Sequence, residues 1–282
     1  MTAAQAILRG ILALIVAMAV MFVVNLLILS PIKHFASQQQ LSDTYRAELT
    51  AGTAPVSEGD FNKNLLPDGA PVGILTIPQL GLREVIVEGT SGGDLMLGPG
   101  HRRDTALPGQ VGVSIVMGRA AAFGGPFGGL QTLQPGDEFQ VRTGQGESTF
   151  SVMGLRYAGD ATPPAPAGGE SRLILMTARG APFMPNGVAY VDAKLVSKAQ
   201  PAGVRQTNAV TLPQTDKPLA TDLTTVWALV FALQFLVVAE IVAVWAFRRV
   251  GPQKTWIVFA PVLLLASLFV ADQITRLLPN LL

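Results

Sequence analysis

The amino-acid sequence predicts a mainly β domain, folded as a closed or nearly closed barrel and carried by three membrane-spanning helices. Apolar runs over Ile11–Ser30, Leu223–Phe247 and Trp256–Ile274 predict the helices. Short β-type runs separated by Gly and Pro turns recur between Val72 and Val196, with little helical pattern between them. The composition agrees, because 49% hydrophobic and 14% charged residues are too apolar for an ordinary soluble protein.

Each apolar run approaches or exceeds the roughly 20 residues that a helix needs to cross a bilayer. The first has an apolar core longer than the roughly 7–15 residues of a cleavable signal peptide, so residues 1–31 are predicted to be an uncleaved anchor. The alternative for these runs is a buried core helix. Arg9 precedes the first run, and Arg248, Arg249 and Lys254 lie between the other two. Positive residues favour the cytoplasmic side. The protein is therefore expected to be a multi-pass cell-membrane protein with a cytoplasmic N-terminus and an extracytoplasmic barrel.

Composition changes along the chain mark the expected domain boundaries. Residues 32–71 are polar and contain prolines, which predicts an extracytoplasmic stalk. Residues 72–196 form the barrel, and within them 134–153 (QPGDEFQVRTGQGESTFSVM) predict a hairpin around a glycine-containing turn. A Pro/Thr/Gln-rich linker spans 197–222, and 223–282 hold two transmembrane helices joined by a short cytoplasmic loop.

The composition also excludes several classes of site. A net charge of +1 gives no basic face for nucleic acid. The absence of cysteine excludes disulfides, thiol catalysis and thiolate metal ligands. The two histidines, His34 and His101, have no paired spacing, and no glycine-rich nucleotide motif is present. No metal or cofactor is therefore predicted.

Three stretches carry a family resemblance: IPQLGLREVIVEGTSGGDLMLGPGHRRDTALPGQVG, GGPFGGLQTLQPGDEFQV and RLILMT. In this order and spacing they resemble the sortases, the membrane-anchored cysteine transpeptidases of Gram-positive bacteria, and most the class E type. The resemblance covers roughly residues 72–196. It implies an eight-stranded β-barrel with short helices in the connections.

The chemistry of sortases requires a cysteine nucleophile, a histidine and an arginine. The resemblance places Arg119, after Gly118, at the histidine, and Ala178, after Thr177, at the cysteine. The arginine is expected near residues 186–188, where Val188 stands at the matching position. These changes predict that the chain is not an enzyme but a catalytically inactive sortase-like protein. The alternative is a transpeptidase or hydrolase that uses non-standard residues.

Four residues are candidates for ligand binding. Arg119 and Arg179 flank the expected cleft and could hold a carboxylate or phosphate through forked hydrogen bonds. Their alternative role is as solvated loop arginines. Thr177 and His101 are the remaining hydroxyl and imidazole that such a cleft could use. The predicted function is that of a peptide-binding, scaffolding or accessory subunit of a cell-envelope complex, whose partner is a peptide or another membrane protein.

Two polar residues lie inside the second apolar run, Gln234 and Glu240. An ionisable group at that depth costs roughly 2.5–3.5 kcal/mol when it faces lipid. Both residues are therefore expected to contact protein, either a partner subunit or Asn25 on the first run. The alternative for Glu240 is snorkelling toward the membrane interface.

Overall fold

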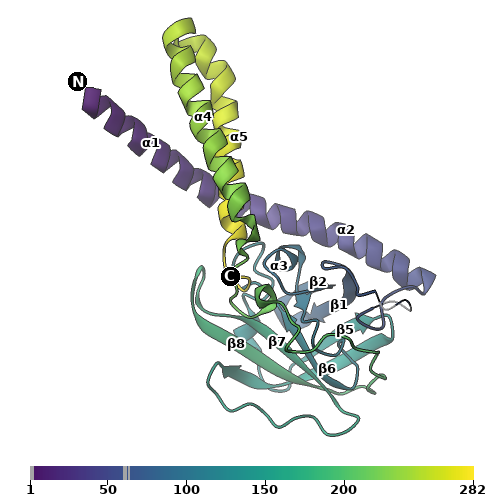
Figure 1. Ribbon diagram of the computed structural model, residues 1–282. Coiled ribbons are helices and arrows are strands. Elements are labelled where there is room, and N and C mark those ends of the chain that lie inside the picture. The colour runs from purple at the N-terminus through teal and green to yellow at the C-terminus, as the bar shows by residue number, and fades with distance from the viewer. Residues whose placement is uncertain (1–2, 60–61, 63) are drawn as a thin grey trace. The chain divides into compact units, whose positions relative to one another are not determined.

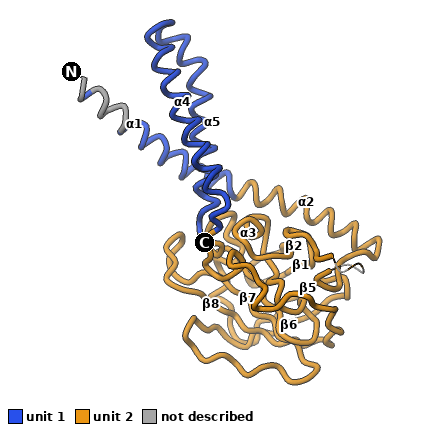
Figure 2. Tube along the Cα trace, viewed as in Figure 1, with its two compact units in different colours: residues 1–30, 222–278 blue, residues 31–221, 279–282 orange. Residues whose placement is uncertain are grey.

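The computed structural model describes residues 3–59, 62 and 64–282 and divides into two compact units (Figures 1 and 2). One unit, here called the helical unit, comprises residues 1–30 and 222–278. The other, here called the barrel unit, comprises residues 31–221 and 279–282. Residues 279–282, which follow the helical unit in the sequence, therefore belong to the barrel unit.

The barrel unit is built on eight strands: β1 (Pro71–Ile77), β2 (Leu82–Glu88), β3 (Gly100–His101), β4 (Gly112–Met117), β5 (Glu138–Thr143), β6 (Gly146–Tyr157), β7 (Ser171–Ala181) and β8 (Met184–Leu195). They form a closed barrel in the order β1-β2-β3-β4-β7-β8-β6-β5, and β5 pairs with β1. The β2–β3 and β4–β7 pairs are parallel, and the other pairs are antiparallel. The predicted closed barrel is confirmed.

The predicted hairpin is the β5–β6 pair. Residues of β5 alternate strictly between exposed and buried, as expected for a strand with one face toward a core. Phe139 and Phe150 lie opposite each other in the register and stack with ring centroids 5.7 Å apart. Thr143 pairs with Gly146 at the turn. These rings form part of the apolar core inside the barrel.

Strand β7 is buried on both faces from Ser171 to Ala178, which explains the apolar run LILM in its middle. Leu173 and Leu175 contribute to the core inside the barrel. Ile174, Met176 and Ala178 point the other way, because successive side chains of a strand alternate between its faces. They belong to a second cluster, here called the outer cluster: Leu95, Ile115, Met117, Ile174, Met176, Ala178, Val188 and Leu281. Its member Leu95 lies on the short helix α3 (Asp94–Leu97).

Residues 32–71, predicted to be a stalk, include most of helix α2 (Ser30–Ala51), which packs against the barrel. Tyr45 is fully buried and its hydroxyl donates to the Val72 carbonyl at 3.1 Å. The Gln38 side chain hydrogen-bonds both the N–H and the C=O of Val85. The helix therefore covers β1 and β2. Its contacts rest on a few residues rather than on a broad apolar stripe, which is why the polar sequence suggested a spacer.

Two further segments differ from the predicted boundaries. The expected linker 197–222 lies along the barrel, where the Val111 N–H donates to the Gln200 carbonyl at 2.9 Å and the Thr90 hydroxyl donates to the Asp216 carbonyl at 2.8 Å. Residues 279–282, assigned above to the transmembrane region, bind the barrel unit. Both differences arise from contacts between residues that are far apart in the sequence. Local composition contains no information about such contacts.

The helical unit contains α1 (Ala3–Val24), a π-helical turn (Asn25–Leu29), α4 (Val226–Val250) and α5 (Pro252–Arg276). Among the residues that the structure describes, three helical stretches are long and apolar enough to cross a membrane, at Leu14–Ala51, Leu223–Val250 and Pro252–Arg276. Asn25 is buried and its side-chain amide donates to the Thr275 hydroxyl of α5 at 3.1 Å. The polar partner of Asn25 is thus on α5 rather than at Glu240.

Candidate functional site

The site begins where β4 ends, at Gly118 and Arg119. The Gly118 N–H donates to the Met176 carbonyl at 2.9 Å, which extends the pairing of β4 with β7 by one residue. A Cβ atom on Gly118 would lie 2.5 Å from the buried ring of Phe127. Position 118 therefore accepts no side chain. The chain passes close under this aromatic ring and then presents Arg119.

Arg119 is fully buried, and its guanidinium donates to four backbone carbonyls. Nε donates to Leu95 at 3.2 Å, and Nη2 donates to Gly92 at 2.8 Å. Nη1 donates to Leu282 at 3.2 Å and to Pro279 at 3.4 Å. Gly92 lies just before helix α3 and Leu95 lies on it, whereas Pro279 and Leu282 come from the far end of the chain. The guanidinium therefore joins segments that are more than 160 residues apart.

The charge of Arg119 is stabilised by dipoles and an aromatic ring. Its guanidinium carbon lies 5.0 Å from the centroid of the Phe123 ring, within the range of a cation–π contact. Burial lowers the pKa of Arg119 to about 9, so the side chain still carries its charge at pH 7. A cation held in this way binds backbone carbonyl groups, which are the acceptors that a peptide offers.

The three positions that differ from the sortase pattern lie around one feature, residues 279–282. Ala178 pairs with Val188 across β7 and β8, and both belong to the outer cluster together with the fully buried Leu281. The Ala120 N–H, next to Arg119, donates to the Leu281 carbonyl at 2.8 Å. Arg119, Ala178 and Val188 thus border a single apolar site on the outer face of the barrel wall.

The other sequence candidates do not join this site. Arg179 is exposed, and its guanidinium stacks over the Tyr157 ring at 4.0 Å, so it forms no clamp with the buried Arg119. Thr177 points to the face of β7 opposite Ala178, and its hydroxyl donates to the Gly118 carbonyl at 3.0 Å. The structure therefore provides no Thr177–His101 pair.

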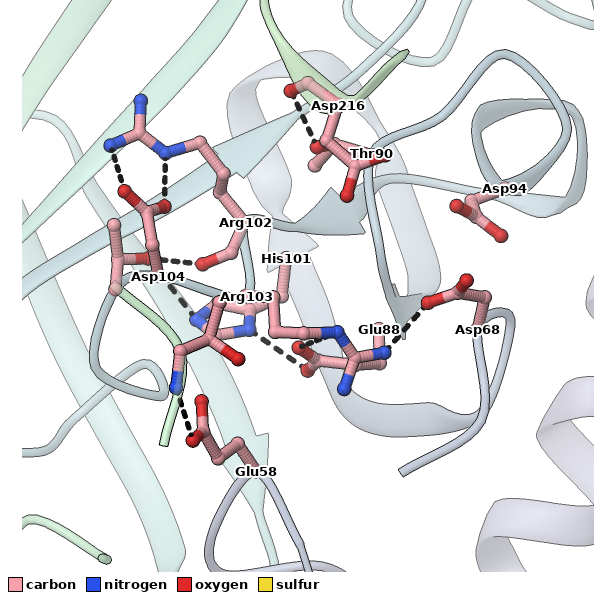
Figure 3. A network of polar contacts seen from close by, with 12 residues as sticks. Glu58, Asp68, Glu88, Thr90, Asp94, His101, Arg102, Arg103, Asp104 and Asp216 are labelled. Atoms are coloured by element: carbon pink, nitrogen blue, oxygen red, sulfur yellow. Dashed lines mark hydrogen bonds and ion pairs between the residues drawn. The ribbon is translucent and has the colours of Figure 1, made fainter. Parts of the chain in front are cut away.

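His101 belongs to a buried polar network that Figure 3 shows. Its Nδ1 lies 2.9 Å from the Glu88 carboxylate, and its Nε2 lies 2.9 Å from the Ala106 carbonyl. Arg103 lies near the same Glu88 carboxylate, with Nε 3.9 Å from Oε1, and donates to Asp68 at 2.7 Å. Both Glu88 and His101 are almost completely buried. His101 therefore fixes the β2–β3 region rather than lining the site around Ala178.

Two carboxyl groups with raised pKa values lie in the loops that hold residues 279–282. Burial, opposed by hydrogen bonds from Ser91, raises the pKa of Asp94 to about 6. Burial, with repulsion from Asp94 and Asp68, raises the pKa of Asp216 to about 6. Asp94 accepts from the hydroxyl and the N–H of Ser91 at 2.7 and 3.1 Å. Ionisation of Asp94 and Asp216 therefore destabilises the folded conformation of these loops.

Asn280 is the functional candidate that the sequence analysis missed. It is fully buried, and its side-chain amide donates to the carbonyls of Thr90 at 2.8 Å and Lys217 at 2.9 Å, with a longer contact of 3.4 Å to Thr215. Its N–H donates to the Ala220 carbonyl at 2.9 Å. The available signal was an asparagine among leucines in LLPNLL, just beyond the end of the last apolar run.

The membrane candidates lie on α4 of the helical unit. Gln234 is exposed, whereas Glu240 is half-buried. Glu240 lines a groove of about 470 Å³ between α4 and α5, together with Arg248, Thr255 and Trp256. A partner contact at Glu240 remains a prediction.

Comparison with known proteins places the barrel in a family. The Sortase domain family matches residues 75–196. This domain belongs to the sortase family. The sortase domain is also 32% identical to Sortase D of Bacillus subtilis (strain 168) over 85 residues, which are 30% of this chain and 41% of that relative. The alignment thus spans about two fifths of the relative's length, and the class E resemblance stays a prediction.

Solved sortase structures resemble the chain at low sequence identity. A Clostridium perfringens Sortase D5 transpeptidase is 18% identical, with a TM-score of 0.45, over 58% of this chain and 99% of that one. Clostridium perfringens sortase C with the C-terminal cell wall sorting motif is 18% identical, with a TM-score of 0.44, over 57% and 89%. A lid mutant of Streptococcus agalactiae Sortase C1 is 23% identical, with a TM-score of 0.41, over 60% and 91%.

The family assignment corrects one expectation. The changes at Arg119, Ala178 and Val188 predicted that the chain is not an enzyme, and this prediction is wrong. The sortase match points to a family whose members are cysteine transpeptidases, and no finding shows loss of activity. The physical reason is that a substitution excludes one nucleophile and not catalysis in general. Because the chain contains no cysteine, any acyl transfer that it performs uses no thiol of its own.

Proposed function

We propose that this sortase-domain protein binds a peptide segment of another cell-envelope protein and acts as a membrane-anchored accessory subunit of an envelope complex. The observation that carries the proposal is the site around Arg119. A buried cation that donates only to backbone carbonyls lies beside an apolar cluster that accepts leucine. Backbone acceptors and apolar side chains are what a short peptide supplies.

We further propose that α1, α4 and α5 cross the cell membrane and that the barrel is extracytoplasmic. The basic residues Arg248, Arg249 and Lys254 lie where α4 meets α5, which favours a cytoplasmic loop. Residues 222 and 279 flank this helix pair, and the segments beyond them belong to the barrel unit. A hairpin that crosses the membrane twice returns the chain to the side from which it entered, so residues 31–221 and 279–282 would lie on one side of the membrane.

Peptide retention tests the binding function. The chain without residues 279–282 is incorporated into nanodiscs and exposed to a library of synthetic peptides, and retained peptides are identified by mass spectrometry. We expect a defined set of apolar peptides, which the matched variant Ala178→Phe loses because the added ring fills the outer cluster. The same spectra record any cleaved or transferred product. Retention of no peptide, or of the same set by both proteins, would contradict the proposal.

A further inference from the structure

Residues 279–282 occupy the barrel wall in the way that a ligand does. They form a tight turn, because the Leu282 N–H donates to the Pro279 carbonyl at 3.0 Å. Asn280 and Leu281 are fully buried, and Leu282 is 5% exposed. The eight strands close the barrel without them. The segment is therefore an occupant of the outer face rather than a part of the sheet.

The hydrogen bonds of the Arg119 guanidinium are divided between fixed parts of the barrel unit and the 279–282 segment. Its Nε and Nη2 donate to Leu95 and Gly92, which are fixed parts of the barrel unit. Both acceptors of Nη1, the carbonyls of Pro279 and Leu282, come from the occupant. When the 279–282 segment leaves, Nη1 needs new acceptors, and a second peptide can supply them.

The remaining contacts bind the side chains of Asn280 and Leu281. The Asn280 amide is fixed by the carbonyls of Thr90, Lys217 and Thr215, an arrangement that selects a side chain with two N–H donors. The Leu281 side chain fills the outer cluster, and the main chain is fixed by the Ala120 N–H. The site thus selects an asparagine followed by a leucine in a turn.

We propose that the 279–282 segment is an intramolecular competitor for the peptide site, and that the site takes short turn-forming peptides of the composition Pro-Asn-Leu-Leu from a partner. This inference rests on the proposed peptide-binding function. It adds the class of peptide that the site binds and the competition that regulates the binding. A tethered ligand acts at an effective concentration in the millimolar range. A segment with a dissociation constant of about 0.1 mM would then weaken the apparent affinity for a partner peptide about tenfold.

Fluorescence anisotropy measures this competition with a labelled, C-terminally amidated peptide of sequence Leu-Pro-Asn-Leu-Leu. The proteins are the full chain in nanodiscs, the chain without residues 279–282, and the Asn280→Ala variant, which loses the contacts of the Asn280 amide but keeps the rest of the segment. We expect the chain without residues 279–282 to bind the peptide about tenfold more tightly than the full chain, and the Asn280→Ala variant to shift in the same direction by up to that factor. A peptide of sequence Leu-Pro-Ala-Asp-Leu should bind none of them. The matched control Asn208→Ala, at a surface turn of the 197–222 segment, should behave as the full chain.

Thiol labelling follows the segment directly and does not require the truncated chain to fold. Since the sequence has no cysteine, the single variants Leu281→Cys and Val210→Cys each carry one thiol. Val210 is 93% exposed, whereas Leu281 is fully buried, so maleimide should react much more slowly with the Leu281→Cys variant. Excess Leu-Pro-Asn-Leu-Leu peptide, or the added change Asn280→Ala, should accelerate that reaction.

The outcomes separate the two proposals. Equal peptide affinity in the full chain and both variants would overturn the competition while leaving peptide binding intact. Binding by none of the proteins, including the chain without 279–282, would overturn the proposed function and the competition with it. Labelling of Leu281→Cys that neither excess peptide nor Asn280→Ala accelerates would overturn the competition.

Discussion

Lowering the pH from 7 to 5 should stabilise the barrel unit through Asp94 and Asp216. Burial, together with repulsion among these two groups and Asp68, raises both pKa values from 3.8 to about 6, and Arg103 opposes the shift. The folded chain therefore holds more protons than the unfolded chain between about pH 4 and 6, and stability falls as the pH rises through that window. One such group contributes about 1 kcal/mol between pH 7 and 5, and the pair about 2 kcal/mol.

Pulse proteolysis in urea, on the full chain in detergent at pH 5, 6 and 7, measures the free energy of unfolding of the barrel unit. The double variant Asp94→Asn, Asp216→Asn should lose most of this pH dependence and be more stable than the natural chain at pH 7, because an amide in place of Asp94 still accepts from Ser91. Asp43→Asn, at an exposed position of α2, is the control and should change neither quantity. An unchanged pH dependence in the double variant would refute the assignment of these carboxyl groups.

Three other changes give distinct expected outcomes. Gly118→Ala should lower the free energy of unfolding by about 1–3 kcal/mol because its methyl group meets the Phe127 ring, and adding Phe127→Leu should restore part of the loss in the same urea assay. Glu88→Gln should lower the free energy of unfolding by about 1–3 kcal/mol, because it replaces the buried carboxylate that hydrogen-bonds His101. Asp68→Asn, at a side chain that is 69% exposed, should lower it by less than about 1 kcal/mol. Glu240→Leu should preserve membrane insertion and reduce the recovery of co-purifying protein in mild detergent; full recovery would argue against a partner contact.

Local patterns were sufficient to predict the strands and the long helices. The alternation in β5 and the apolar run of β7 are consequences of burial on one face or two, and a sequence records burial directly. The long apolar runs likewise reported the helices, because hydrophobic length is a local property. The density of short strands predicted a closed or nearly closed barrel, and the sortase resemblance then supplied the number of strands.

The arrangement of the site could not be predicted because it depends on distant contacts. Arg119 and Arg179 look equivalent in the sequence, since each follows an apolar strand and precedes a glycine-containing turn. Only the fold makes Arg119 a buried donor to four carbonyls and leaves Arg179 exposed and stacked on the Tyr157 ring. Asn280 and Leu281 follow a long apolar helix, and composition gave no reason to connect them with a strand about 100 residues earlier.

The burial of β7 on both faces has a consequence for the order of biosynthesis. A ribosome completes β8 well before it reaches the 279–282 segment. The strands can therefore pair before Leu281, which completes the outer cluster, has been synthesised. At roughly 5–20 residues per second, the intervening helices α4 and α5 delay its synthesis by several seconds. During this interval Met176 and Ala178 lack the side chain of Leu281. The nascent barrel would therefore expose Met176 and Ala178 until the 279–282 segment has been synthesised.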